Sequence, residues 1–281
     1  MKIVVTGATG FIGQHVRNEL AKTDHDVVLV VRTRKNAGGL IGRESIVVAD
    51  LKQERTDWFE LFGKPDAVLH LAWGGLPNYM DAYHVEVELP MQSKFLQALI
   101  ESGLKKLVVT GTCYEYGMSS GALSEDQETN PNTPYGIAKD NLRKELFELR
   151  KSKKFDLTWA RIFYPYGEGQ SEYSLYSQLR NCAKSGIKEF KLYNGESKLD
   201  FVPVETVASS LLKLLIQSGI GLVNIGSAKP RLVVDFAQAL VTDNKWGLSL
   251  VVVQNGNRSY EAKEFWADIS KMQSVESIRR V

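Results

Sequence analysis

The chain has 281 residues, of which 43% are hydrophobic and 24% are charged. This composition is that of a globular protein with one large or two small domains, and it excludes a chain that is disordered throughout. The 35 lysines and arginines exceed the 33 aspartates and glutamates by a formal charge of only +2, which excludes the strongly basic surface that nucleic-acid binding requires.

The few cysteines and histidines predict neither a disulfide framework nor a metal site. There are two cysteines, and the four histidines do not stand at metal-ligand spacing. At the start of the chain a glycine, Gly7, comes too early to leave room for the apolar core of a secretory signal. Apolar runs such as 27–31 are far shorter than the ~18 residues of a membrane span. We therefore expect a cytoplasmic protein with no membrane or nucleic-acid partner.

In chain order, short apolar runs alternate with longer amphipathic segments through the first half of the sequence. The predicted strands are 2–5, 27–31, 46–49, 67–71, 106–110 and 157–162. Because these runs are apolar without alternation, both faces of the sheet must be covered by helices. The pattern predicts an α/β fold with a doubly wound parallel sheet.

Two of the intervening segments have the spacing of amphipathic helices. Apolar side chains recur every four residues from Ile12 to Leu20 and again from Val87 to Leu99. Pro90 interrupts the second series and predicts a kink or a later helix start, since proline lacks a backbone donor.

The pattern becomes irregular after about residue 163, with aromatic and glycine-rich stretches. We predict a dinucleotide-binding domain over 1–162 and a smaller α/β substrate lobe over 163–281, partly interleaved with the first. The cleft between them is the expected ligand site.

A glycine-rich turn directly follows the first predicted strand. Its glycines are Gly7, Gly10 and Gly13, and Phe11 and Ile12 lie between the last two. Glycines at this spacing allow a tight turn, close approach of a pyrophosphate and close helix packing, and the helix amino terminus favours the phosphates. With a strand before it and a helix after it, the motif predicts dinucleotide binding.

The end of the second predicted strand indicates which dinucleotide binds. An acidic residue here would hold the ribose of NAD, but the sequence has Arg32 and Arg34 with no carboxylate between them. Arginine grips a phosphate bidentately. The sequence therefore favours NADP(H) over NAD, which remains the alternative.

The chain resembles the extended short-chain dehydrogenase/reductase family, in its nucleotide-sugar epimerase, dehydratase and reductase branch with a Rossmann domain. Besides the glycine turn, 48–51 is similar to the segment whose aspartate, here Asp50 beside Leu51, contacts adenine. The stretch 70–73 resembles the strand motif that lines the cofactor. The resemblance implies that His70 is structural. The cofactor-lining residues it implies here are Leu71, Ala72 and Trp73.

The family's Tyr-x-x-x-Lys signature is matched by Tyr135 and Lys139. Thr133 is placed to cap a helix that begins at Pro134, and the i, i+4 spacing puts both side chains on one helix face. A neighbouring ammonium favours the ionised form of a phenol, whose pKa is ordinarily about 10. The resemblance implies that this pair is catalytic and that Lys139 also holds the nicotinamide ribose.

Upstream, 109–117 resembles the family stretch that carries a catalytic serine or threonine. Counting back from its Tyr-Gly end selects Thr112, with Thr110 as the rival. Dehydratases of the family place an acidic residue two positions later, where this chain has Tyr114. Glu115 comes one residue too late, so dehydration is disfavoured.

In the second half, 160–167 resembles the segment that passes the nicotinamide and includes Tyr164. Leu199 stands where many members have an arginine, so the substrate diphosphate contact passes to Lys198, Arg231 or Arg258. Four residues are expected to shape the substrate pocket, with core packing as the alternative for each of them: Trp73, Cys113, Tyr114 and Tyr164.

These expectations lead to three functions. The first is an NADPH-dependent reductase of a nucleotide-linked 4-keto-6-deoxyhexose, used to make a deoxysugar for surface polysaccharide. The second is a nucleotide-sugar 4-epimerase with tightly held NAD, and the third is a non-catalytic nucleotide-sensing protein. The resemblance also makes a homodimer one of the assemblies open to the chain.

Overall fold

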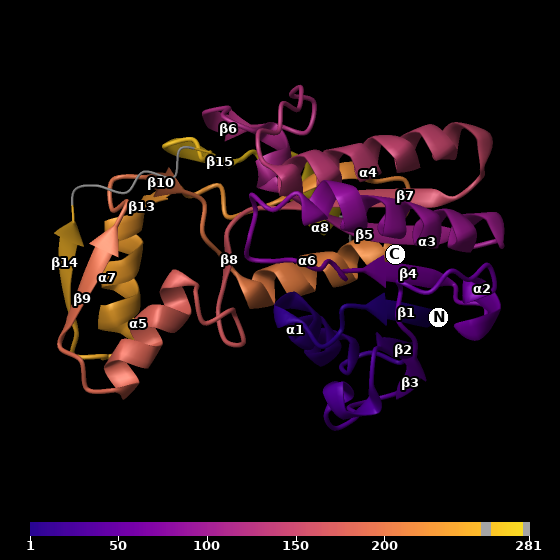
Figure 1. The fold of residues 1–281 in the computed structure, drawn as a ribbon, viewed down its shortest axis with the longest axis horizontal. Coiled ribbons are helices and arrows are strands. Elements are labelled where there is room, and N and C mark those ends of the chain that lie inside the picture. Colours follow the sequence, from indigo (N-terminus) through magenta and orange to yellow (C-terminus); the bar gives the residue numbers. More distant parts are fainter. Residues whose placement is uncertain (254–259, 278–281) are drawn as a thin grey trace.

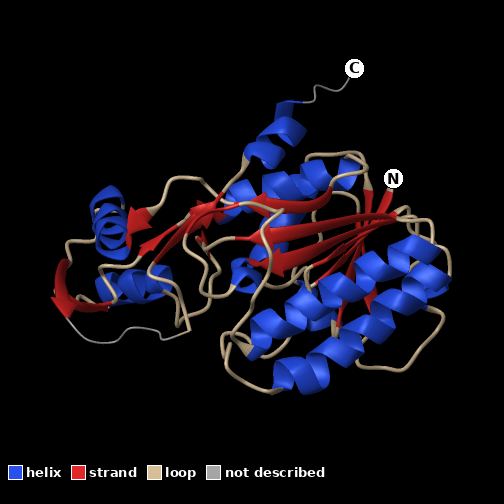
Figure 2. Cartoon of the chain, turned by 90° about the horizontal axis from the view of Figure 1, so that it is seen from above, coloured by secondary structure: helices blue, strands red, loops and turns tan. Residues whose placement is uncertain are grey.

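In the computed structural model, which describes residues 1–253 and 260–277, a large parallel sheet is flanked by helices on both faces. A smaller group of elements extends from one end of this sheet (Figure 1). Seen from above, the strands of the large sheet fan out between two helical layers (Figure 2).

The large sheet has seven parallel strands in the order β12-β7-β5-β4-β1-β2-β3. Its strands, in chain order, are β1 (Lys2–Thr6), β2 (Asp26–Val31), β3 (Glu44–Val48), β4 (Ala67–His70), β5 (Lys106–Thr112), β7 (Asp156–Ile162) and β12 (Gly221–Ile225). The first six coincide with the predicted runs to within two residues at each end. The prediction of a doubly wound α/β fold is confirmed.

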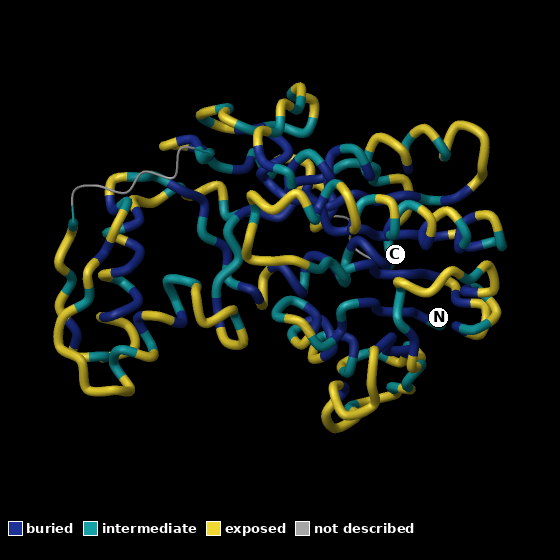
Figure 3. The backbone as a smooth tube through the Cα atoms, viewed as in Figure 1, coloured by how far each residue is buried: buried dark blue, intermediate teal, exposed yellow. Residues whose placement is uncertain are grey.

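Each face of the sheet has its own apolar core. One core joins the sheet to α1 (Phe11–Leu20), α6 (Val204–Ile216) and α8 (Ser270–Ser277). The other joins it to α2 (Trp58–Leu61), α3 (Leu89–Glu101) and α4 (Pro134–Ser152). Figure 3 shows the buried strands between the partly exposed outer surfaces of these helices.

The remaining elements form the smaller lobe and its connection to the sheet. A four-stranded sheet has the order β13-β10-β15-β6, and two-stranded pairs join β11 to β8 and β14 to β9. Their bounds are β6 (Gly121–Leu123), β8 (Pro165–Tyr166), β9 (Glu189–Tyr193), β10 (Lys198–Leu199), β11 (Val202–Pro203), β13 (Arg231–Leu232), β14 (Ser249–Val253) and β15 (Glu264–Ala267), with helices α5 (Leu175–Lys184) and α7 (Val233–Asp243). Helix α6 and strand β12 come after residue 163 in the chain, but they pack in the large sheet and its helical layer. The domain boundary predicted at 162/163 therefore divides that sheet.

Helix starts follow the local sequence. A π-helical turn, η2 (His84–Glu88), precedes α3, and Pro90 lies in the first turn of that helix. The later helix start predicted from Pro90 is therefore confirmed, because the first turn does not need the missing backbone donor.

The centre of the sheet sets the stability of this fold. Leu69 on β4 is fully buried between β1 and β5. We expect Leu69→Ala to lower the free energy of unfolding by about 2–5 kcal/mol, because it leaves a cavity in a packed core. Val48→Ala is the control, since Val48 on the edge strand β3 is 51% exposed and should change stability by only about 0.5 kcal/mol. Urea unfolding measures the free energy of unfolding of both variants. Equal losses would contradict the assignment of Leu69 to the packed core.

Candidate active site

The loop after β1 meets the loop after β4 where the strand order reverses, which is where α/β sheets bind ligands. Gly7 has φ +70°, and a Cβ there would lie 2.7 Å from the backbone nitrogen of Ala72. A Cβ on Gly13 would lie 2.2 Å from the carbonyl oxygen of Gly7. Both positions therefore require glycine.

This turn leads into α1, whose amino end is suited to an anion. Gly10 is the N-cap residue, and no side chain caps the helix. Phe11 and Ile12 begin its first turn, where uncapped backbone N–H groups and the helix dipole favour negative charge. The turn and helix fit the pyrophosphate of a dinucleotide, in agreement with the sequence prediction.

The ends of β2 and β3 lie at the same edge of the sheet. Arg32 directly follows β2 and is exposed, and Arg34 begins the 3₁₀ turn η1 (Arg34–Ala37). Asp50 follows β3, and its carboxylate accepts a hydrogen bond of 3.0 Å from the backbone N–H of Lys52. Leu51 packs against the α2/α3/α4 core. All four residues come from loops at the carboxyl ends of strands.

His70 is a structural residue, as the resemblance implies. Its Nδ1 lies 2.8 Å from the Thr6 hydroxyl, and the residue is fully buried at the end of β4. Burial lowers the pKa of His70 to about 3, and the nearby charge of Lys139 acts in the same direction. The imidazole is therefore neutral at physiological pH.

Tyr135 and Lys139 lie on one face of α4, near its amino end. The Thr133 hydroxyl caps the helix by accepting a 3.0 Å hydrogen bond from the backbone N–H of Gly136, and Pro134 occupies the first position. Tyr135 is 8% exposed and Lys139 is 3% exposed. The local sequence therefore buries both groups.

The Lys139 ammonium is held from two sides. Its Nζ donates a 2.9 Å hydrogen bond to the carbonyl oxygen of Thr110 and lies 4.0 Å from the centroid of the Trp73 ring. Burial lowers the pKa of Lys139 to about 7, while the carboxylates of Glu115 and Glu88 act in the opposite direction. Lys139 is therefore poised to titrate near neutral pH.

The structure selects Thr112 over Thr110 as the threonine beside Tyr135. Burial raises the pKa of Tyr135 well above its usual value, with the hydrogen bond from Thr112 acting in the opposite direction. Thr112 ends β5 and caps η3 (Cys113–Tyr116). The Thr110 hydroxyl instead donates to the carbonyl oxygen of His70, at 3.3 Å.

Glu115 is fully buried and held by three hydrogen-bond donors. Its carboxylate accepts hydrogen bonds from Arg161 Nε (2.7 Å), Trp159 Nε1 (2.9 Å) and the backbone N–H of Thr112 (2.8 Å). A group bound in this way is not placed to act as a dehydratase acid.

Aromatic side chains from distant segments surround Tyr135. Its ring centroid lies 5.2 Å from that of His84, 5.5 Å from Tyr79, 6.0 Å from Trp73 and 6.3 Å from Tyr114. The Trp73 indole N–H donates to His84 Nδ1 at 3.1 Å. Sequence reasoning missed Tyr79 and His84, whose only signal is the aromatic-rich segment after β4.

A third missed residue, Glu261, comes from just before β15. Its Oε1 accepts a 2.8 Å hydrogen bond from the Tyr114 hydroxyl, and the Tyr164 hydroxyl donates to the same atom. The Tyr114 and Tyr164 ring centroids are 6.4 Å apart. The structure thus brings Tyr114 and Tyr164 together around a carboxylate that the sequence did not single out.

Two other predicted substrate residues, Lys198 and Arg231, lie on the paired strands β10 and β13. Lys198 forms an ion pair of 2.8 Å with Glu264. Because side chains alternate along a strand, Lys198 and its neighbour Leu199 lie on opposite faces of the sheet. The substrate contact of Lys198 stays a prediction. Arg231 pairs with Leu199 and shares its face.

Cys113 is buried in the core of the smaller lobe, where burial raises the pKa of its thiol. Packing, the alternative given from the sequence, describes it better than substrate contact. Arg258 lies outside the described residues.

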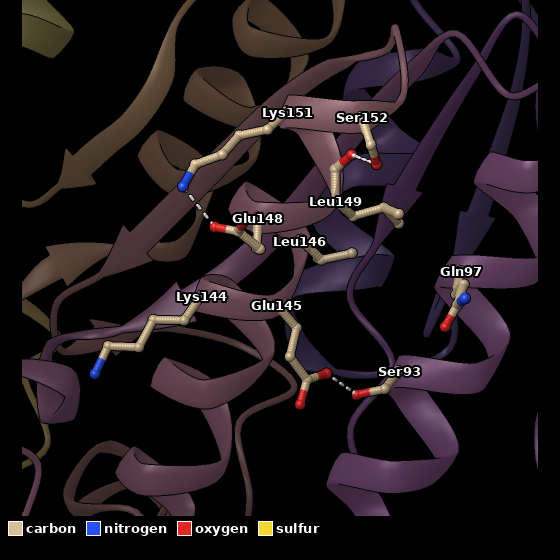
Figure 4. Close-up of a pocket in the computed structure, with 9 residues that line it drawn as sticks. All are labelled: Ser93, Gln97, Lys144, Glu145, Leu146, Glu148, Leu149, Lys151 and Ser152. Carbon is tan, nitrogen blue, oxygen red and sulfur yellow. Dashed lines mark hydrogen bonds and ion pairs between the residues drawn. The ribbon is translucent and has the colours of Figure 1, made fainter.

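A shallow groove elsewhere is separate from this site. It lies between α3 and the carboxyl-terminal half of α4, and Leu146 and Leu149 line it together with polar and charged side chains, among which Ser93 donates to Glu145 (Figure 4). In the described part of the chain, no cluster of three metal-ligating side chains occurs. Nor does any described helix combine the length and apolar character of a membrane span.

The model of the NAD dependent epimerase/dehydratase family matches residues 3–226, which include the glycine turn and the Tyr135/Lys139 pair. The chain belongs to this family. The family description names NAD and gives no support to the NADP preference drawn from Arg32. An exposed arginine is satisfied by water, so its presence alone does not require a phosphate.

Among curated proteins, the dTDP-6-deoxy-L-talose 4-dehydrogenase (NAD(+)) of Aggregatibacter actinomycetemcomitans is 26% identical, over 95% of this chain and 99% of the relative. An uncharacterized UDP-glucose epimerase of Bacillus subtilis is also 26% identical, over 98% and 92%. A solved UDP-N-acetylglucosamine 4-epimerase of Methanobrevibacter ruminantium has a TM-score of 0.87 at 21% identity, covering 100% of this chain and 93% of that one. The structural likeness supports the family's fold.

The burial of Lys139 predicts how stability depends on pH. Below about pH 7 its ammonium is charged in both the folded and the unfolded chain, so the cost of burial is fully present. Above pH 7 the folded protein releases this proton while the unfolded chain keeps it until about pH 10.5, which relieves the cost. Relative to Lys139→Met, the wild type should therefore gain up to about 1.4 kcal/mol of unfolding free energy per pH unit from pH 7 to 9. Urea unfolding at each pH measures the difference in unfolding free energy between the wild type and Lys139→Met. If the two free energies change with pH in parallel, the prediction is contradicted.

Proposed function

We propose that this protein oxidises the C4 hydroxyl of a nucleotide-linked hexose with NAD and completes a 4-epimerisation. The observation that carries the proposal is the buried constellation of Tyr135, Lys139 and Thr112 at the switch-point edge of the sheet. The names of several relatives support it: one is named an uncharacterized UDP-glucose epimerase, one a probable UDP-arabinose 4-epimerase and one a putative UDP-glucose 4-epimerase. They support this alternative better than an NADPH-dependent ketoreductase.

The residues at the glycine turn and at the ends of β3 and β4 are placed to hold the dinucleotide. Bound NAD supplies the hydride acceptor for C4. Lys139, whose ammonium lies next to Trp73, would hydrogen-bond the nicotinamide ribose. The residues assigned to NAD binding are Gly7, Gly10, Phe11, Ile12, Gly13, Asp50, Leu51, Leu71, Ala72, Trp73, Lys139 and Tyr164. Arg32 and Arg34 are assigned to the adenosine end of the cofactor.

The chain's own residues move the proton. Tyr135 accepts the proton of the C4 hydroxyl during oxidation and returns it to the carbonyl oxygen during reduction. Thr112 hydrogen-bonds the same oxygen and stabilises its developing charge. Burial disfavours a lone phenolate and a lone ammonium. When the Tyr135 phenolate and the Lys139 ammonium form as a neighbouring pair, their mutual attraction offsets part of that cost.

A net 4-dehydrogenase is the second candidate, because this chain spans 99% of the talose 4-dehydrogenase. It spans only 76% of a UDP-arabinose 4-epimerase from rice. Run in reverse, the 4-dehydrogenase reaction is the reduction of a 4-keto-6-deoxyhexose. The presence of Tyr135, Lys139 and Thr112 together argues against a non-catalytic sensor.

Product analysis distinguishes the two reactions. Purified protein with NAD is given UDP-glucose, UDP-N-acetylglucosamine or dTDP-6-deoxy-L-talose, and both the sugar epimers and the absorbance of NADH are followed. A 4-epimerase forms the C4 epimer without net NADH, whereas a dehydrogenase forms NADH in step with the 4-ketosugar. Absence of both products from all three substrates would overturn the proposal.

Replacing the phenol tests the chemical role of Tyr135. We expect Tyr135→Phe to lower turnover by about 10²- to 10⁴-fold, because the group that exchanges the proton is lost. Tyr173→Phe is the matched control, since Tyr173 is 68% exposed and should retain wild-type turnover. Equal turnover of Tyr135→Phe and wild type would contradict the mechanism.

A further inference from the structure

Trp73 places an aromatic face against the ammonium of Lys139. Its ring centroid lies 4.0 Å from Lys139 Nζ, and the indole packs against the core that α2, α3 and α4 share with the sheet. Lys139 itself is 3% exposed. An aromatic face attracts a cation, most strongly where water is excluded, and it gives a neutral amine no such attraction. The contact therefore favours the charged form of the lysine.

The hydrogen bonds of His84 hold this indole in place. The Trp73 indole N–H donates to His84 Nδ1 at 3.1 Å, and His84 Nε2 lies 2.9 Å from the carbonyl oxygen of Asn78. An indole nitrogen only donates and a carbonyl oxygen only accepts, so Nδ1 is the unprotonated nitrogen and Nε2 carries the hydrogen. Both nitrogens of this fully buried ring are thus used. His84 thereby fixes the edge of the indole whose face meets Lys139.

The other surroundings of Lys139 leave its charge finely balanced. Burial lowers its pKa to about 7, while the carboxylates of Glu115 and Glu88 act in the opposite direction. At pH 7 such a lysine is about half charged, and a pKa lower by one unit would leave about a tenth charged. The charged and titratable groups around it lie on several elements: Glu115 on η3, Glu88 and His84 on η2, His70 on β4, Arg161 on β7 and Tyr135 on α4.

We propose that Trp73 is a positioning residue that keeps Lys139 in its ammonium form beside Tyr135, with His84 holding the indole in place. This inference rests on the proposed function, in which the ammonium hydrogen-bonds the nicotinamide ribose and favours the Tyr135 phenolate. It gives Trp73 a task beyond lining the cofactor. Without the aromatic face, a larger share of the molecules carries a neutral amine at neutral pH.

A double-mutant cycle between Trp73 and Lys139, measured by urea unfolding at pH 6 and pH 9, tests the role of charge in this contact. It compares the wild type, Trp73→Leu, Lys139→Met and the double variant, so that groups common to all four proteins cancel. At pH 6, where Lys139 is charged, Trp73→Leu should lower the folding equilibrium constant roughly 5- to 10-fold more with Lys139 present than in the Lys139→Met background. At pH 9 Lys139 is uncharged in the folded protein, and the coupling should fall to within about 2-fold.

Three further variants separate this effect from a general loss of packing. Trp73→Phe keeps a weaker aromatic face, so its coupling to Lys139→Met at pH 6 should be only about 2- to 3-fold, and it replaces Trp73→Leu if that variant does not fold. His84→Leu removes the acceptor of the Trp73 N–H and should couple in the same direction as Trp73→Leu at pH 6. Trp266→Leu removes the aromatic face beside another lysine, since Lys198 Nζ lies 5.6 Å from its ring centroid. It should show no coupling to Lys139→Met at either pH.

Coupling of equal size at pH 6 and pH 9, or none at either pH, would overturn the inference, because packing alone does not depend on the charge of Lys139. Absence of coupling in His84→Leu would overturn the part assigned to His84. The cycle uses neither cofactor nor sugar, so both outcomes leave the proposed function standing. Failure of that function is seen separately, as the absence of both epimer and NADH in the product analysis.

Discussion

The buried carboxylate of Glu115 joins the elements that carry the reactive side chains. It accepts hydrogen bonds from the backbone of Thr112 at the end of β5 and from Arg161 on β7, and it lies 3.7 Å from Arg143 on α4. A buried charge is stable only when it is fully paired, and an unpaired one is strongly destabilising. This constraint holds β5, β7 and α4 in one arrangement, and with it the relative positions of Thr112 and the Tyr135 helix.

Behind this network, Tyr135 and Lys139 are buried and Tyr135 is ringed by aromatic side chains. Burial raises the pKa of Tyr135 and lowers that of Lys139. Each group is therefore costly to ionise alone, which favours a proton exchanged locally with a bound sugar. The burial of these two side chains thus underlies the proposed chemistry.

The sequence was informative where function depends on neighbouring residues. The six apolar runs, the glycine turn and the Tyr135/Lys139 spacing are local signals, and they gave the sheet, the dinucleotide end and the reactive pair. Contacts between distant segments have no such signal, so Tyr79 and Glu261, which lie 56 and 126 residues from Tyr135 in the chain, were not predicted. The ion pair between Lys198 and Glu264 also joins distant segments, so the sequence did not predict it.

The central claim is that hydride leaves C4 of the sugar while Tyr135 handles only the proton. A nucleotide-linked hexose with deuterium at C4 tests it directly, in a single turnover that is quenched rapidly and analysed by mass spectrometry. The account predicts deuterium on the reduced nicotinamide, and in an epimerase its return to C4 of the product. Product that has lost its deuterium to water, with none on the cofactor, would contradict the account.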